Sequence, residues 1–471
     1  MPLTIFKNFK YLVFAQVISQ AFGFFTVVYI ARILGASGFG VIVFAQTLSS
    51  YFFILTDLGT TKYGMREVAR TNVDTINYTI NIITIRIVLT IISFTLIVCC
   101  ALIIDREYVV KMVIILFGLT LFANMIFVDW VFKGLEQMQY VAVASVIERA
   151  SYFVLIMALV NKDTNILLIP IIYLAGNILA SVYLLYVLGN KYNYEKLPNA
   201  KTDVMKQILC MSLPLALSSL MVRVNNNVDT LFLGIMKNDE VVGYYNAAYK
   251  IILVIFLVGG YYVTAIFPVA SRMFHNSIRD LENLLSNSVR VLLSLGIPMA
   301  FGGIILGQQI ITTVYGSKYL SSVVPLQVLC IYIPISFITM VYADSLIACD
   351  MQKQYAVGMT ISAIVNILTN VILIPPFGMI GAALATITSE IVLFIYSFYN
   401  LSKLVKVGFV KQSVVPTVCS IIMCIALMYI HCNIISMIAI GVIVYMCSMV
   451  IFKGVSVNEI VVIKDMILDR N

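Results

Sequence analysis

The stretch "MVRVNNNVDT", residues 221–230, puts polar groups inside a long apolar run that begins near Ile208. It contains one arginine, three asparagines and one aspartate, namely Arg223, Asn225, Asn226, Asn227 and Asp229. A single Arg or Asp at the centre of a bilayer costs about 2.5–3.5 kcal/mol on translocon scales. A membrane helix that keeps all five therefore needs protein or water beside them.

A helical wheel divides this segment into two faces, because successive side chains are about 100° apart. The apolar face is formed by Leu217, Leu220, Met221, Val224, Val228 and Leu231. The polar face takes Ser218, Ser219, Thr230 and the five residues named above. Because packing between helices rarely uses half a face, we expect this helix to line a wet cavity. The alternative is that the amides only bond to neighbouring helices, at roughly 0.6 kcal/mol each.

The composition of the whole chain is that of a polytopic membrane protein. Of its 471 residues 61% are hydrophobic and 11% charged, against about 25% charged in soluble domains. No signal-peptide cleavage site is visible, so the first apolar segment is expected to remain as a span. About fourteen apolar runs are long enough to cross the hydrocarbon core. They lie near 11–33, 41–61, 82–104, 109–129, 140–160, 165–189, 208–235, 246–270, 288–311, 322–347, 355–374, 379–400, 412–432 and 434–452.

The distribution of Lys and Arg predicts the orientation of these spans. With the N-terminus inside, few cations fall on outer connectors: Arg32, Arg106, Lys111, Lys162, Lys237 and Lys318. Most others fall inside, which is the positive-inside pattern and predicts that both termini are cytoplasmic. The net charge of +8 is thus explained by topology, and no nucleic-acid partner is expected. The nine cysteines lack metal-site spacing and are interpreted as apolar packing residues.

An internal repeat predicts the domain organisation. "ILGASGFGVIVFAQ" (33–46) is similar to "FLGIMKNDEVVGYYNAA" (232–248), and "GLEQMQYVAVA" (134–144) to "ACDMQKQYAVGM" (348–359). Six spans separate equivalent points, so the halves share one orientation, as in parallel-repeat transporters. We predict an all-α fold of two six-helix bundles and a C-terminal helix pair. The divisions are bundle 1–189, linker 190–207, bundle 208–400, and spans with a cytoplasmic tail at 401–471.

Catalytic machinery is not evident in the sequence. The two histidines, His275 and His431, have no neighbouring nucleophile or metal-ligand array, and no phosphate-binding GxxxxGK[ST] loop occurs. No connector is long enough to form a folded catalytic domain. We therefore expect a transporter that is not an enzyme and uses no cofactor.

Several stretches resemble the bacterial polysaccharide-biosynthesis flippases, which share a superfamily with multidrug and toxin extruders and the lipid II flippase. They are "ARILGASGFG" (31–40), "LTDLGTTKYGMREVAR" (55–70), "DWVFKGLEQM" (129–138), "VDTLFLGIMKNDEVVGYYNAAYKI" (228–251) and "PPFGMIGAALATITSE" (375–390). The resemblance covers residues 1 to about 400. It implies a V-shaped pair of bundles in the bacterial inner membrane, working by alternating access. The implied cargo is an undecaprenyl-pyrophosphate-linked oligosaccharide, such as an O-antigen unit, moved to the periplasmic leaflet.

The same resemblance implies roles for the charged residues in the spans. Cations that could meet the pyrophosphate or acidic sugars are Arg223, Arg86, Arg149 and Lys250, with Arg32 at the outer mouth. A separate hypothesis, which does not rest on the resemblance, concerns four carboxylates that could couple transport to a proton or sodium gradient, or gate it: Asp57, Glu148, Asp229 and Glu390. For Asp57, near a span end, a capping role is the alternative. Glu148 and Arg149 point about 100° apart on a helix, so each is expected to find a different partner.

Two other interpretations remain open at this level. A cation-coupled multidrug exporter of the same fold would need an acidic, aromatic pocket, whereas the helix around Arg223 is mixed in charge and rich in amides. A membrane scaffold for a polysaccharide polymerase and a chain-length regulator is compatible with transport.

Overall fold

The computed structural model describes residues 2–70, 75–162, 164–191, 201–430, 432–452 and 454, with side chains from Ala15 onward. Every regular element in these ranges is a helix, as predicted. Twelve of the helices are long and apolar enough to cross a membrane. The chain is therefore a multi-pass membrane protein. The orientation of its termini stays a prediction.

The chain divides into two compact units, residues 1–243 and 244–471. This boundary follows Gly243, so the helix that carries "MVRVNNNVDT" belongs to the first unit, whereas the sequence assigned it to a second bundle. Residues 192–200 of the predicted linker and most of the predicted C-terminal tail lie outside the described residues. The parallel-repeat relation between the predicted bundles stays a prediction.

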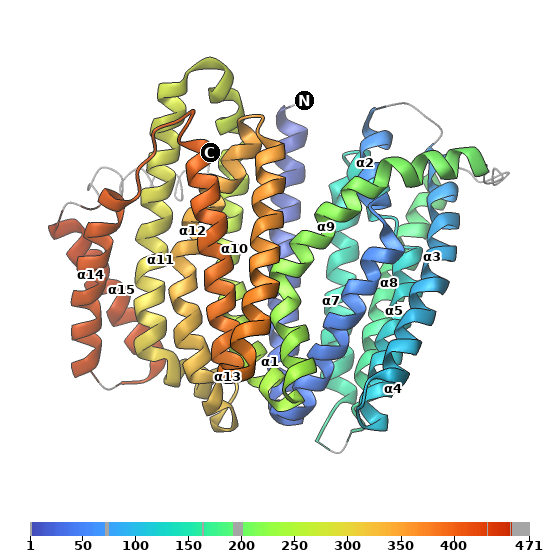
Figure 1. Cartoon of the computed structure of the whole chain (residues 1–471), viewed down its shortest axis with the longest axis horizontal. Coiled ribbons are helices and arrows are strands. Elements are labelled where there is room, and N and C mark those ends of the chain that lie inside the picture. Colours follow the sequence, from blue (N-terminus) through green and yellow to red (C-terminus); the bar gives the residue numbers. More distant parts are fainter. Residues whose placement is uncertain are drawn as a thin grey trace. The chain divides into compact units, whose positions relative to one another are not determined.

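The first unit is built from long helices joined by short connectors (Figure 1). Its helices are α1 (Pro2–Asp57), α2 (Thr60–Arg70), α3 (Thr75–Ile103), α4 (Tyr108–Gly118), α5 (Thr120–Met125), α6 (Asp129–Gly134), α7 (Met138–Leu159), α8 (Leu168–Lys191) and α9 (Thr202–Met236). The long helix α1 packs against α7, α9 and α3 within this unit. It is therefore the helix around which the polar residues described below are arranged.

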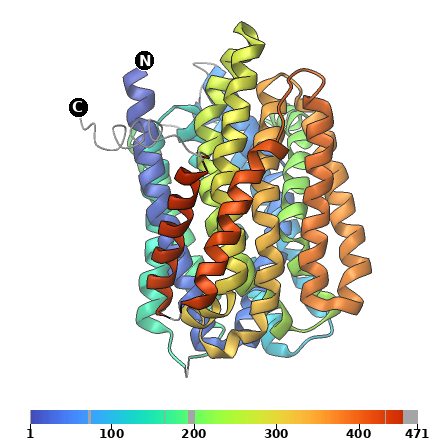
Figure 2. The ribbon, with the colours of Figure 1, turned by 90° about the vertical axis from the view of Figure 1, so that its left-hand side faces the viewer.

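The second unit contains the remaining helices, except for residues 239–243 of α10, which belong to the first unit. They are α10 (Asp239–Asn276), α11 (Ile278–Val314), the 3₁₀ helix η1 (Ser317–Ser322), α12 (Val323–Ala348), α13 (Gln352–Leu401), α14 (Val410–Tyr429) and α15 (Ile434–Ile451). The helices α14 and α15 pack against α11 (Figure 2). At 1.5 Å per residue, α10 and α11 are each about 55 Å long, well beyond a hydrocarbon core of about 30 Å. They extend past their neighbours as a helical hairpin (Figure 1).

Two glycines explain why fourteen predicted spans correspond to twelve long helices. The helix α1 turns back on itself at Gly35, whose φ is 70°, and so covers the predicted spans 11–33 and 41–61. The helix α13 turns in the same way at Gly378, with φ 55°, and covers 355–374 and 379–400. Positive φ is readily adopted only by glycine, so each turn is possible without a longer connector.

The predicted span 41–61 ends earlier than expected, at Asp57. Leu58 and Gly59 both have positive φ, at 39° and 77°, and α2 begins at Thr60. This second helix is amphipathic: Tyr63 and Val68 are buried against the aromatic residues of α6, while its basic residues are exposed. The carboxylate of Asp57 accepts the Thr61 backbone N–H at 3.1 Å and thereby caps α2. The capping alternative for Asp57 is thus observed.

Candidate functional site

The polar face of α9 is divided in the structure between protein contact and exposure. Arg223, Asn225 and Asn227 are half-buried and Asn226 is exposed. By contrast, Asp229 is 2% exposed and is enclosed by protein. The prediction of one continuous wet face is wrong at this end of the segment, because the last turns of α9 pack against α1.

Tyr51 of α1 lies next to this segment. Its hydroxyl donates to the backbone oxygen of Arg223 at 3.5 Å, and it is within electrostatic range of both Asp229 and the Arg223 guanidinium. The Asn227 side chain donates to the same backbone oxygen at 3.5 Å. Both bonds are long and use the main chain, so neither binds the guanidinium of Arg223.

A second polar group surrounds Arg149 on α7. Its side chain is 42% exposed, and its Nε lies 3.8 Å from the Glu148 carboxylate, which is 19% exposed. The two residues therefore form a loose pair, and the expectation of separate partners is wrong. Tyr152 and Tyr173 are within electrostatic range of Arg149, and their ring centroids are 5.1 Å apart.

Two helices give this group an aromatic and amide surrounding. The side chains of Gln46 and Asn177 lie close to the Tyr173 hydroxyl of α8, and Asn177 Nδ2 donates to the Tyr173 backbone oxygen at 2.8 Å. Gly23 of α1 faces this group: a Cβ built there would have Nη1 of Arg149 as its nearest atom, at 4.0 Å. The Arg149 site thus combines a cation with tyrosines and amides, which suits an anionic, hydroxylated ligand.

Arg86 is in a different environment from the one predicted. It is 3% exposed, and its guanidinium makes four hydrogen bonds to protein. Nη2 donates to Asp57 Oδ1 at 2.5 Å and to Thr61 at 2.6 Å, Nε to Thr60 at 3.0 Å, and Nη1 to the Phe127 backbone oxygen at 3.3 Å. The structure therefore contradicts the placement of Arg86 in a cavity: this guanidinium joins α1, α2 and the segment before α6.

The remaining predicted residues are dispersed. Arg32 is exposed on α1 just before the turn at Gly35, and Lys250 is half-buried on α10 in the second unit. Glu390 of α13, also in the second unit, is half-buried and hydrogen-bonded to hydroxyls of α12, those of Tyr332, Ser336 and Thr339. Asp57, Glu148, Asp229 and Glu390 thus occupy four separate environments.

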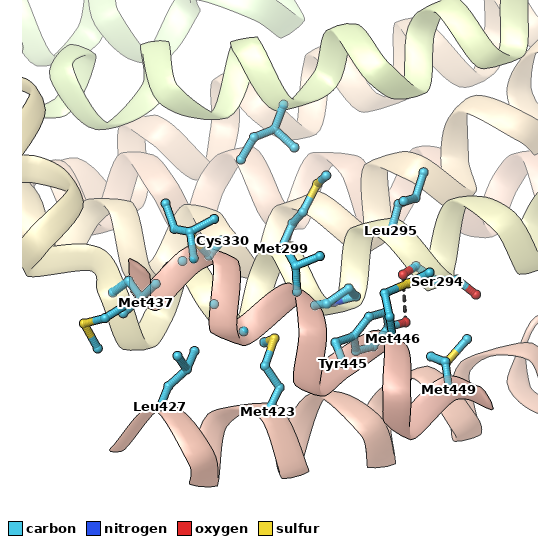
Figure 3. Close-up of a pocket in the computed structure, with 18 of the residues that line it drawn as sticks. Ser294, Leu295, Met299, Cys330, Met423, Leu427, Met437, Tyr445, Met446 and Met449 are labelled. Carbon is cyan, nitrogen blue, oxygen red and sulfur yellow. Dashed lines mark hydrogen bonds between the residues drawn. The ribbon is translucent and has the colours of Figure 1, made fainter. Parts of the chain in front are cut away.

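The second unit contains an apolar cavity of about 1250 Å³ that the sequence did not predict (Figure 3). It lies among α10, α11, α12, α14 and α15, and methionines from several of these helices surround it, including Met299, Met423 and Met437. Its polar lining includes Arg290 and Asn287 of α11. The Tyr445 hydroxyl is bonded to the Ser294 backbone oxygen at 2.7 Å. The sequence feature that could have predicted this cavity is the combination of Gly302, Gly303 and Gly441 with several flexible methionines in the same helices.

Comparison with known proteins assigns the family. The sequence profile described as "Polysaccharide biosynthesis protein" matches residues 5–274. The chain belongs to this family. Among its relatives are a probable low-salt glycan biosynthesis flippase of Haloferax volcanii, 29% identical over 183 residues, and a putative O-antigen transporter of Escherichia coli K12, 23% identical over 251 residues. These matches cover 39% and 52% of this chain and only 39% and 60% of the relatives' own lengths.

Solved structures define the fold of this polysaccharide biosynthesis protein. The lipid II flippase MurJ, in an inward closed conformation, superposes with a TM-score of 0.77 over 94% of this chain and 98% of that one, at 17% identity. An inward-facing multidrug transporter of the MATE family gives a TM-score of 0.65 over 82% and 95%, at 14% identity. The all-helical membrane fold expected from the sequence is therefore confirmed, and both of these solved transporters share it.

Proposed function

We propose that this protein is a flippase for lipid-linked oligosaccharides. The observation that carries the proposal is the partly exposed side chain of Arg149 among tyrosines and amides, inside a bundle of membrane-spanning helices. Family membership and relatives with the names of a glycan flippase and an O-antigen transporter support it. The cargo we propose is an undecaprenyl-pyrophosphate-linked repeat unit, moved from the cytoplasmic to the periplasmic leaflet of a bacterial inner membrane.

Arg149 and Arg223 would bind the pyrophosphate, because a guanidinium can offer two parallel donors to a phosphate. The amides of Asn225, Asn226 and Asn227 would bond to sugar hydroxyls. Arg32 and Lys250 remain candidates for contact with acidic groups near the ends of the path. Arg86 is left out of this set, because its donors are bonded to protein.

The apolar cavity offers a place for part of the prenyl chain. Its lining is dominated by methionine and aliphatic side chains, and methionine adapts readily to an irregular apolar ligand. Gly302 borders it, with Met423 Cε 3.8 Å from where a Cβ would lie, so Gly302→Leu would fill space without a backbone clash. We expect G302L to weaken the apparent affinity for long prenyl chains more than for short ones. Gly408→Leu, in open space between α13 and α14, is the matched control.

Of the four carboxylates, Glu390 is the strongest candidate for coupling to a proton or sodium gradient. Asp57 is bound by Arg86 at 2.5 Å and also caps α2, so its carboxylate has a structural role. A hydroxyl can donate to a carboxylate or accept from a carboxylic acid, so the partners of Glu390 fit both protonation states. Tyr355 lies within electrostatic range of both Glu390 and Asp344. Glu148 and Asp229 are the secondary candidates.

The test uses purified protein in proteoliposomes with a fluorescent prenyl-pyrophosphate oligosaccharide. Transfer to the inner leaflet, where an added glycosidase cannot reach the sugar, measures flipping. We expect activity from the unchanged protein and little from an Arg149→Ala/Arg223→Ala variant. Arg70→Ala, an exposed cation of α2, is the control and should flip normally.

Two outcomes would overturn the proposal. One is a protein that moves no prenyl-linked sugar but exports cationic drugs, which would favour the multidrug alternative. The other is a gene deletion that leaves surface polysaccharide complete. The predicted association with a polymerase and a chain-length regulator is a separate proposal, tested by co-purification from detergent.

A further inference from the structure

An ion pair between Arg106 and Asp239 lies beside the C-terminal end of α9, beyond the polar segment. Arg106, in the connector between α3 and α4, donates Nη1 to Asp239 Oδ2 at 2.7 Å, and Nη2 to the Gly234 backbone oxygen. The two side chains are 17% and 13% exposed. The guanidinium also lies over the ring of Phe44, 5.5 Å from its centroid. All of these residues belong to the first unit.

Next to this ion pair the backbone of α1 touches the backbone of the first residues of α10. A Cβ on Gly40 of α1 would lie 1.7 Å from the Asp239 backbone oxygen, and one on Gly243 would lie 1.9 Å from the Ala36 oxygen. A Cβ on Gly234 would overlap the Phe44 ring at 2.2 Å. At Gly40 and Gly243 backbone meets backbone, so separation there would free no interlocked side chains, whereas Gly234 packs on the buried Phe44 ring.

The ion pair itself is also suited to opening. Burying two charges costs nearly as much hydration as their attraction returns, so a buried pair is close to balance with its hydrated, separated state. The second carboxylate oxygen of Asp239, Oδ1, is buried without a hydrogen-bond partner among the described residues, which further raises the free energy of the closed form. Arg86 and Asp57, with four hydrogen bonds on the guanidinium, have no such deficit.

The location of the pair connects it to the substrate path. Gly234 follows Arg223 by eleven residues, about 16 Å along the same helix. A headgroup that moved along the polar residues of α9 would meet this closed end next. The positive-inside pattern assigns the connectors of Arg106 and Lys237 to the outer side of the membrane.

We propose that Arg106 and Asp239 form a latch that closes the outer end of the substrate path and parts once in every transport cycle. The proposal rests on the flippase function for its biological meaning, but the opening itself is a property of this chain. It can therefore be tested with and without cargo.

The first experiment needs no cargo. Thr230 is 3% exposed and lies one turn before Gly234, so Thr230→Cys is a reporter of opening in a chain whose nine native cysteines have been replaced. We expect Arg106→Gln and Asp239→Asn each to speed its labelling by an impermeant maleimide at least five-fold. Lys111→Gln, a half-buried cation in the first turn of α4 that bonds to the Leu102 backbone oxygen, is the control and should leave labelling unchanged. Equal labelling in all these proteins would overturn the latch.

The second experiment measures the cycle. In the cysteine-free chain, Arg106→Cys/Asp239→Cys is bridged by a short bifunctional thiosulfonate, and flipping is measured before bridging, after it, and after reduction. We expect more than a ten-fold loss that reduction reverses. The matched control is Asp129→Cys/Lys133→Cys, a charge pair within α6, where the bridge joins two residues of one helix and should not restrict movement between helices.

Two results of the bridging experiment would count against the proposals, and they differ. Unchanged flipping by the bridged Arg106→Cys/Asp239→Cys protein would show that the pair is structural and would overturn the latch. A reduced protein whose reporter labels as expected but which flips no prenyl-linked sugar would instead contradict the proposed cargo.

Discussion

Arg86 and Arg149 are both arginines of apolar helices in the first unit, and they have opposite surroundings. Arg86 is 3% exposed and donates to Asp57, two threonine hydroxyls and a backbone oxygen. Arg149 is 42% exposed at its side chain, and its nearest carboxylate is 3.8 Å away. A guanidinium whose donors are already bonded to protein stabilises the fold, whereas one with donors to spare can bind a ligand.

The largest effect is expected at Arg86. Arg86→Ala leaves the Asp57 carboxylate buried without its cation, which costs about 3–5 kcal/mol. We expect a steep fall in folded protein, measured as monodisperse yield and thermal midpoint in detergent. Arg86→Met/Asp57→Asn should recover much of the loss, because it removes both charges and keeps an oxygen to cap α2. If R86A were stable and failed only in transport, Arg86 would have a role in transport like that of Arg149, and the structural role inferred for it would be wrong.

Arg149→Ala and Arg223→Ala should affect transport and leave the fold intact. Each removes charge-assisted bonds worth about 1.5–3 kcal/mol, which corresponds to roughly a 10–100-fold lower flipping rate. Thermal midpoints should stay near that of the unchanged protein. Arg149→Lys, which keeps the charge but loses the planar pair of donors, should be intermediate. Normal flipping by Arg223→Ala would leave only helix packing as the role of its polar segment.

Glu390→Gln extends the comparison to carboxylates. The amide can still bond to the hydroxyls of Tyr332, Ser336 and Thr339 but cannot change its charge. We expect flipping to continue while its acceleration by an imposed proton or sodium gradient is lost, measured in proteoliposomes with defined gradients. Asp57→Asn is the contrast: it should lower stability without changing the response to the gradient. An unchanged gradient response in E390Q would make Glu148 and Asp229 the leading candidates for coupling.

The smallest effect is expected at Asn226, the exposed amide of the polar segment. A neutral hydrogen bond contributes about 0.5–1.5 kcal/mol, so Asn226→Ala should slow flipping by roughly 2–10-fold. The effect should depend on the sugar, because an amide bonds to hydroxyls and not to the prenyl chain. Comparing two oligosaccharides of different composition on one lipid would reveal this dependence. Equal slowing for every cargo would indicate a packing role.

The class of the protein could be read from its sequence because hydrocarbon imposes strong local rules. Every backbone group in a bilayer must be bonded within the protein, so a long apolar run has to be a helix, and the runs can be located without knowing their neighbours. The glycine turns at Gly35 and Gly378 also have a local cause. The polar segment at 221–230 was recognisable for the same reason, since its cost in lipid depends on its own residues.

The roles of individual charges were decided only by the tertiary structure. Hydropathy and spacing describe Arg86 and Arg149 in the same terms, because both depend on one helix at a time. What separates them is what other segments bring close. Thr60 and Phe127 accept hydrogen bonds from Arg86, whereas Arg149 has two tyrosines within electrostatic range and faces Gly23. The apolar cavity and the Arg106–Asp239 pair are likewise products of packing between distant segments. The partners of an ion pair and the lining of a cavity are set by surroundings that no single helix contains.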